Sequence, residues 1–157
     1  EYPEDLNADR LWDILDQLRS YGGLSQNGTG GGQTTVADTP LKVNQWASFM
    51  GTPVNMTVSH GTDDIIVHKT GIYEVHVHIS FATATAAEIK FHVYVNGASA
   101  NISTNRITSN TDKGSCSMTG VLDLEAGDIV TIYVESVAAA EDITLSESQF
   151  WIAGRIS

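Results

Sequence analysis

The chain has 157 residues, of which 41% are hydrophobic and 17% are charged. That is about one globular domain, with a composition unlike that of disordered chains. The formal net charge of −11 disfavours binding to nucleic acid or to anionic lipid, and no apolar run approaches the ~20 residues of a membrane-spanning helix.

The first segment with a regular pattern is a helical one over residues 7–21. Its apolar residues are spaced i, i+3, i+4 and i+7, Asn7 or Asp5 can cap its start, and Gly22-Gly23 can end it. An isolated helix of this length is marginal in water, so the stripe needs a partner. It either folds back on its own domain or docks on sister chains or a larger assembly, and we favour docking. The predicted docking residues are Leu11, Trp12, Ile14, Leu15 and Leu18.

A stretch rich in glycine, serine and threonine follows, GGLSQNGTGGGQTT over residues 22–35. It has no apolar periodicity, which is typical of a flexible linker. The sequence therefore predicts three parts: an anchoring helix over 1–21, a linker over 22–39 and a folded head over 40–157.

From Pro40 onward, apolar and polar residues alternate with period two, as in strands that bury one face. In the segment 71–81, for example, Tyr73 and Val75 fall on one face and His76 and His78 on the other. We expect strands within 41–49, 54–59, 65–68, 72–81, 89–95, 117–124, 129–136 and 148–157, with a further one after Asn96-Gly97. The Asn-Gly pair predicts a type I′ hairpin turn. Eight to ten short strands at this spacing indicate a sandwich or a barrel.

Four motifs in this region resemble the tumour-necrosis-factor/C1q jelly-roll family. They are Gly71-Ile72-Tyr73, the strand from Phe91 to Gly97, the Leu-x-Leu-x-x-Gly-Asp-x-Val hairpin from Leu122 to Val130, and a last strand with Ser148, Phe150 and Gly154. The resemblance covers roughly residues 41–157. It implies an all-β fold, a ten-strand two-sheet jelly-roll sandwich. It also implies assembly as a homotrimer around one sheet, and a role in binding rather than catalysis.

The resemblance places the strand with His76 and His78 in the sheet that lines the trimer axis. Six imidazoles near a three-fold axis can bind a metal or respond to pH, but ordinary polar residues at a wet interface are the favoured interpretation. Trp46 and Trp151 fall in strands that the family places close together, so we expect both in core or trimer packing. A sugar-stacking platform is the alternative for these rings.

The polar stretch 100–114 is the candidate region for contact with a receptor or glycan. Its candidate residues are Asn101, Thr104, Asn105, Arg106, Asn110 and Asp112. Cys116 shares strand parity with Met118 and Leu122, which predicts a small core residue rather than a nucleophile. As the single cysteine it also excludes an internal disulfide.

No motif of a catalytic, phosphate-binding or zinc-binding site occurs in the sequence, so we expect no catalytic residues, metal or cofactor. Calcium held by loop carboxylates is a less favoured alternative. The sequence indicates a non-enzymatic homotrimeric attachment protein at a virion surface, a capsid decoration, spike or fibre head. Its helix would dock on a larger virion or capsid protein, and its head would bind a host receptor or glycan. The alternative is a secreted ligand of the same fold that binds a cell-surface receptor.

Overall fold

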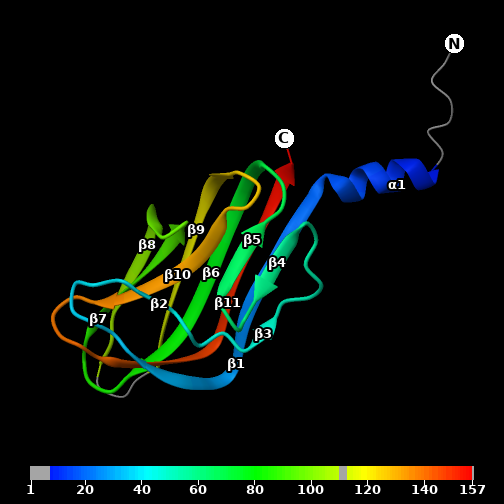
Figure 1. The fold of residues 1–157 in the computed structure, drawn as a ribbon. Helices are drawn as coiled ribbons and strands as arrows, with labels where there is room; N and C mark the ends of the chain where they lie inside the picture. The colour runs from blue at the N-terminus through cyan, green and yellow to red at the C-terminus, as the bar shows by residue number, and fades with distance from the viewer. Residues whose placement is uncertain (1–7, 110–112, 157) are drawn as a thin grey trace, which may run out of the picture.

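The computed structural model describes residues 8–109 and 113–156, and it is a β-sandwich preceded by one helix (Figure 1). The elements in chain order are α1 (Ala8–Gln17), β1 (Arg19–Thr34), β2 (Leu41–Lys42), β3 (Ser48–Phe49), β4 (Met56–Ser59), β5 (Asp64–Val67), β6 (Gly71–Thr83), β7 (Glu88–Val95), β8 (Ala98–Ile107), β9 (Lys113–Leu124), β10 (Ile129–Ser136) and β11 (Asp142–Ile156). The described residues thus contain eleven strands rather than the expected ten.

The strands form two sheets whose order is that of a jelly roll. The first sheet runs β3-β1-β11-β6-β9, and the second runs β4-β5-β10-β7-β8, with β2 also paired to β10. All pairings between named strands are antiparallel. Consecutive strands mostly lie in different sheets, so each sheet is completed only by segments that are distant in sequence. The expected all-β two-sheet jelly-roll sandwich is confirmed.

The core lies between the sheets and is built from the alternate residues that period two predicts. Along β6, Tyr73, Val75 and Ile79 are buried, and the residues between them face outward. The rings of Phe81 and Phe91 meet edge to face across the two sheets, with centroids 5.2 Å apart. The turn at Asn96-Gly97 has φ angles of 52° and 79°, which confirms the predicted type I′ geometry.

The linker interpretation is wrong for residues 22–34, which belong to β1. They pair with β11 from Arg19↔Arg155 to Thr34↔Asp142, with irregularities between Gln26 and Gly32. Glycines are needed here because β1 passes close to its neighbours. A Cβ on Gly23 would lie 2.6 Å from the Cβ of Trp151, which is closer than real side chains approach. The first sheet therefore begins at Arg19, earlier than the expected start of the head.

The helix is shorter than expected. It ends at Gln17, where the Leu18 amide donates hydrogen bonds to the carbonyls of Ile14 and Leu15, and β1 begins at Arg19. From Arg19 onward the backbone forms hydrogen bonds with β11, so the helix does not end at Gly22-Gly23 as expected. Figure 1 shows α1 leading away from the sandwich at the end where β11 finishes.

Two other expected elements differ in extent. The strand expected within 41–49 is divided into β2 and β3, which belong to different sheets, and Trp46 lies between them in no strand. The stretch 100–114, expected as a loop, consists mainly of the end of β8 and the start of β9. Asn110 and Asp112 lie outside the described residues.

Candidate functional site

The outer surface of the first sheet is the most distinctive surface of the described residues. Pairing aligns β1, β11, β6 and β9 in rows, so that the outward residues of four strands lie side by side. We call this surface the outward face. It comprises Tyr21, Ile72, Glu74, His76, His78, Ser117, Thr119, Val121, Gln149, Trp151 and Ala153.

The end of the outward face nearest α1 exposes two apolar side chains next to the acidic residues Glu74 and Asp123. Ile72 and Val121 are 49% and 65% exposed, although both stand in regular strands where polar residues are expected to face water. A shallow hollow of about 410 Å³ lies among Ile72, Glu74, Val121, Ala153 and Gly154. Exposed apolar side chains gathered around a hollow are typical of a protein-protein contact. Sequence reasoning missed Ile72 and Val121 as site residues, although their strand parity places both opposite the core.

The middle of the outward face carries a stacked pair of rings. The His76 imidazole and the Trp151 indole are nearly parallel, with centroids 3.9 Å apart, and Nε2 of His76 is 3.4 Å from a Glu74 carboxylate oxygen. His78 lies one row further along and is exposed. The prediction that both histidines point away from the Tyr73–Val75 side of β6 is confirmed. Whether they face a trimer axis stays a prediction.

The two tryptophans expected together occupy different environments. Trp151 lies half-buried on the outward face. Trp46 is only 4% exposed, and its ring packs against Phe150 in the core with centroids 6.1 Å apart. Trp46 therefore belongs to the core of the protomer and offers little surface to a partner.

The predicted docking residues of the helix are all exposed. Trp12 is 60% exposed, and the exposed fractions of the other four lie between 37% and 48%. The four are Leu11, Ile14, Leu15 and Leu18. The head does not cover this stripe, so the alternative that the helix folds back on its own domain does not describe this structure.

The predicted receptor or glycan residues do not form one loop. Asn101 and Asn105 face solvent from β8, whereas Thr104 and Arg106 have the opposite strand parity. Asn105 Nδ2 donates to Glu88 Oε1 at 2.7 Å. The positive φ of Asn101, 58°, marks an irregularity in the pairing of β7 and β8.

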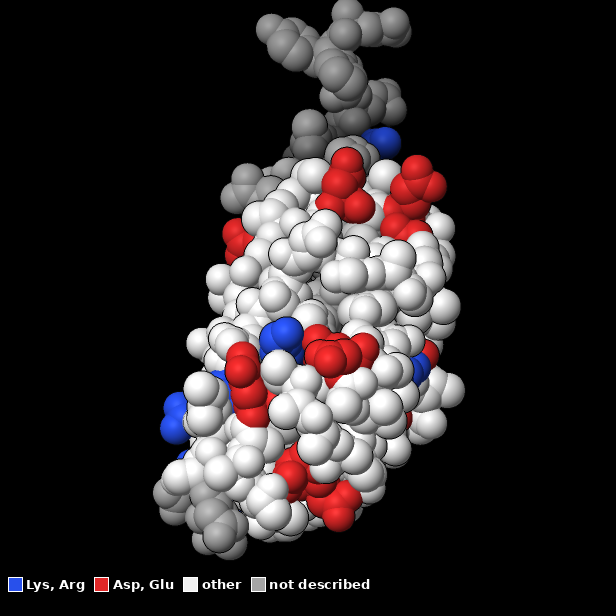
Figure 2. All heavy atoms as spheres, turned by 90° about the vertical axis from the view of Figure 1, so that its left-hand side faces the viewer, with Lys and Arg blue, Asp and Glu red and all other residues white. Residues whose placement is uncertain are grey.

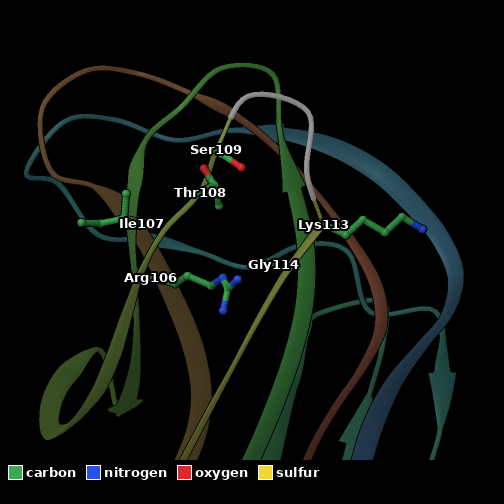
Figure 3. A pocket seen from close by; sticks show the side chains of 6 residues that line it. All are labelled: Arg106, Ile107, Thr108, Ser109, Lys113 and Gly114. Atoms are coloured by element: carbon green, nitrogen blue, oxygen red, sulfur yellow. The ribbon is translucent and has the colours of Figure 1, made fainter.

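Arg106 lines a surface hollow at the β8–β9 end (Figure 3). Its side chain reaches across to β9, where Nη1 donates to the Ser115 carbonyl at 3.1 Å. The side chain of Lys113 points away from it, as Figure 3 shows. The two cations therefore do not converge on one ligand, and Arg106 mainly bridges the open edges of the two sheets.

Neither Cys116 nor the loop carboxylates form a reactive cluster. Cys116 packs against the core, as expected, and burial raises the pKa of its thiol from 9.0 to about 11. A thiol that stays protonated at neutral pH is a poor nucleophile. The Glu141 carboxylate accepts hydrogen bonds from the Thr85 amide and hydroxyl. Among residues 8–109 and 113–156, no group of three or more His, Cys, Asp or Glu side chains is arranged to hold a metal ion.

Acidic and basic side chains are scattered over the side of the molecule shown in Figure 2, and most of that surface is uncharged. Acidic groups predominate there, in keeping with the net charge of −11. Such a surface does not offer the basic stripe that nucleic-acid backbones require. Within the described part of the chain, no helix is both long and apolar enough to cross a membrane.

Comparison with known proteins gives matches in structure but not in sequence. No family model matches the chain, and no curated protein matches its sequence. The structure is similar to Eiger TNF from S. frugiperda, with a TM-score of 0.56, 17% identity, and coverage of 87% of this chain and 91% of that one. It is also similar to murine APRIL, with a TM-score of 0.57, 21% identity, and coverage of 87% and 98%. At these identities the likeness shows the fold alone, and the fold of this chain is a TNF-like jelly roll.

Proposed function

We propose that the chain is a non-enzymatic attachment protein that assembles as a homotrimer through the outward face. The end of that face nearest α1 carries the proposal, because Ile72 and Val121 stand exposed on an otherwise regular sheet beside the half-buried Trp151. Burying apolar surface stabilises by about 25 cal/mol per Å², so covering this end favours association. His76 and His78 lie within the proposed contact, whereas Trp46 lies in the core of the protomer.

We infer that its setting is a virion, as a capsid decoration, spike or fibre head. The helix α1 leads away from the head and exposes Trp12, which suits attachment to a larger virion or capsid protein (Figure 1). The edge strand β8 of the second sheet carries Asn101 and Asn105, which face solvent and suit contact with a host receptor or glycan.

The native mass tests the homotrimer. The chain weighs 16.9 kDa, so native mass spectrometry is expected to give three times that mass. Val121→Arg places three cations at the contact and is expected to produce single chains at micromolar concentration. Ile107→Arg is the matched control, because Ile107 is 73% exposed on β8 and lies outside the outward face. A single-chain mass for the unchanged protein, or equal behaviour of both variants, would contradict the proposal.

A secreted ligand that binds a cell-surface receptor is the second candidate, and the TNF-like fold favours it. Sequons at Asn27, Asn55 and Asn101 would then be available to glycosylation. The Asn55 amide nitrogen already donates to the Arg19 carbonyl at 2.6 Å, which leaves Asn27 and Asn101 as the exposed acceptors.

Centrifugation of medium from the source culture separates these two settings. A virion protein is expected to pellet with particles that contain nucleic acid. The chain recovered from that pellet is expected to have the mass of the unmodified polypeptide. A secreted ligand is expected to remain in the supernatant and to lose mass when N-linked glycans are removed by a glycosidase.

A further inference from the structure

The helix α1 has an apolar side that the described head does not cover. We call the side formed by Leu11, Ile14, Leu15 and Leu18 the α1 stripe, and all four residues are exposed. Figure 1 shows α1 extending away from the sandwich, so no part of the described head covers the stripe. A ten-residue helix does not persist in water by its own hydrogen bonds, so a partner must bury this side.

The spacing of the α1 stripe matches that of a helix within a bundle. Leu11 and Leu18 are one heptad apart, Ile14 takes the intervening d position, and Leu15 takes the adjoining e position.

The α1 stripe also lies next to the proposed trimer contact. Only Leu18 separates the end of α1 from β1, and Tyr21 is the first apolar residue of the outward face along β1. Tyr21 shares a row with Val121, and Ile72 lies in the row beyond, at the end of the sheet from which α1 departs. Three copies joined by this end of the outward face would bring three α1 helices out at one place.

We propose that the partner of the α1 stripe is the same stripe on two further copies of this chain, forming a parallel three-helix bundle above the head. This inference rests on the homotrimer proposed above and specifies what its helices do. Joining the heads raises the local concentration of the helices to the millimolar range, which allows a helix too short to form alone. Trp12 lies beside the stripe, so the bundle leaves it exposed for attachment to the larger assembly.

Disulfide cross-linking of the full chain tests the bundle. In a Cys116→Ala background, Leu11→Cys and Ile14→Cys each place one thiol on the α1 stripe. Trp12→Cys places it on the same helix beside the stripe and serves as the matched control. Each variant is first checked for native mass and then oxidised at low protein concentration, and linked pairs of chains are followed on non-reducing gels.

If the bundle forms, the stripe cysteines are expected to link at least about ten-fold faster than the Trp12→Cys control, because their thiols are held together at high effective concentration. A three-chain mass with equal linking rates would overturn the bundle, leave the homotrimer intact and assign the stripe to another protein. A single-chain mass would overturn the homotrimer and the bundle together. Far-ultraviolet circular dichroism of Ile14→Asp gives a second readout, since the bundle requires this variant to lose helix while Trp12→Asp keeps it.

Discussion

At the scale of single residues, Tyr73 and Gly154 show how closely the first sheet is packed against the core. The Tyr73 hydroxyl donates to the Lys69 carbonyl at 2.6 Å and lies 3.2 Å from the Ser20 hydroxyl, so the ring is fixed at its far end. Gly154, its partner in the pairing of β6 and β11, leaves the space above that ring. A Cβ at position 154 would lie 2.4 Å from Cδ1 of Tyr73.

Gly154→Ala is therefore expected to destabilise the protein by roughly 1–3 kcal/mol, the usual cost of overpacking a site that cannot relax. Gly31→Ala is the matched control, because no atom lies within 4 Å of a Cβ built there and its φ is not in the left-handed region. Urea unfolding at one fixed protein concentration measures both variants. Equal stability of the two would show that the Tyr73 ring is free to move.

The thiol of Cys116 gives a prediction that depends on pH. Burial raises its pKa from 9.0 to about 11, so at pH 8 the folded protein is expected to hold roughly 100-fold less thiolate than the unfolded chain. Labelling by a thiol reagent should accordingly be much slower in the native protein than in urea. Ser103→Cys in a Cys116→Ala background, on the solvent side of β8, should label at the same rate in both states.

The same pKa shift sets the direction of a stability change. Because the folded state holds the proton more tightly, the thiol disfavours unfolding below about pH 9, and this contribution is lost as the pH rises towards 11. Cys116→Ala should lose less stability over that interval than the unchanged protein. An identical loss in both proteins would show that other groups cause it.

At the scale of elements, β1 is the sharpest difference from the sequence-based expectation. A spacer over 22–34 would exchange its amide hydrogens as an unfolded chain does, whereas a strand between β11 and β3 is protected. We expect peptides covering residues 20–26 to exchange about as slowly as those from β6, measured by hydrogen exchange with mass spectrometry. Exchange as fast as that of an unstructured peptide would restore the linker interpretation.

The reason for this difference is physical. Strands such as β6 could be predicted because apolar and polar residues alternate along the local sequence. In β6, Tyr73 and Val75 alternate with Glu74 and His76. Gly23 carries no such local signal. It is a glycine because Trp151, far along the chain, occupies the space of its side chain. For Trp46 the sequence leaves core and trimer packing open for a similar reason, since only the fold shows that it packs on Phe150.

The candidate site was likewise predictable in part. Strand parity alone placed His76 and His78 away from the core. It could not show that Ile72 and Val121 lie close together, because they become near neighbours only when β6 pairs with β9. Composition also could not show that Asn105 and Arg106, both in the candidate region, point to opposite sides of β8.

At the scale of the whole molecule, charge and apolar surface act on assembly in opposite directions. Each chain carries a formal net charge of −11, so three joined chains repel one another over distances that salt screens. The apolar contact around Ile72 and Val121 does not depend on screening in this way. The association constant of the trimer is therefore expected to rise when salt is increased from about 0.01 M, where the Debye length is near 30 Å, to about 0.15 M, where it is near 8 Å.

Sedimentation equilibrium at these two salt concentrations measures the effect. Ser103→Glu, on the solvent side of β8 in the second sheet, would make each chain more acidic and should steepen the salt dependence without removing assembly at high salt. Association that weakens as salt is added would contradict the prediction. It would mean that ion pairs across the contact outweigh the repulsion between the acidic chains. Glu74 is one residue that can form such a pair.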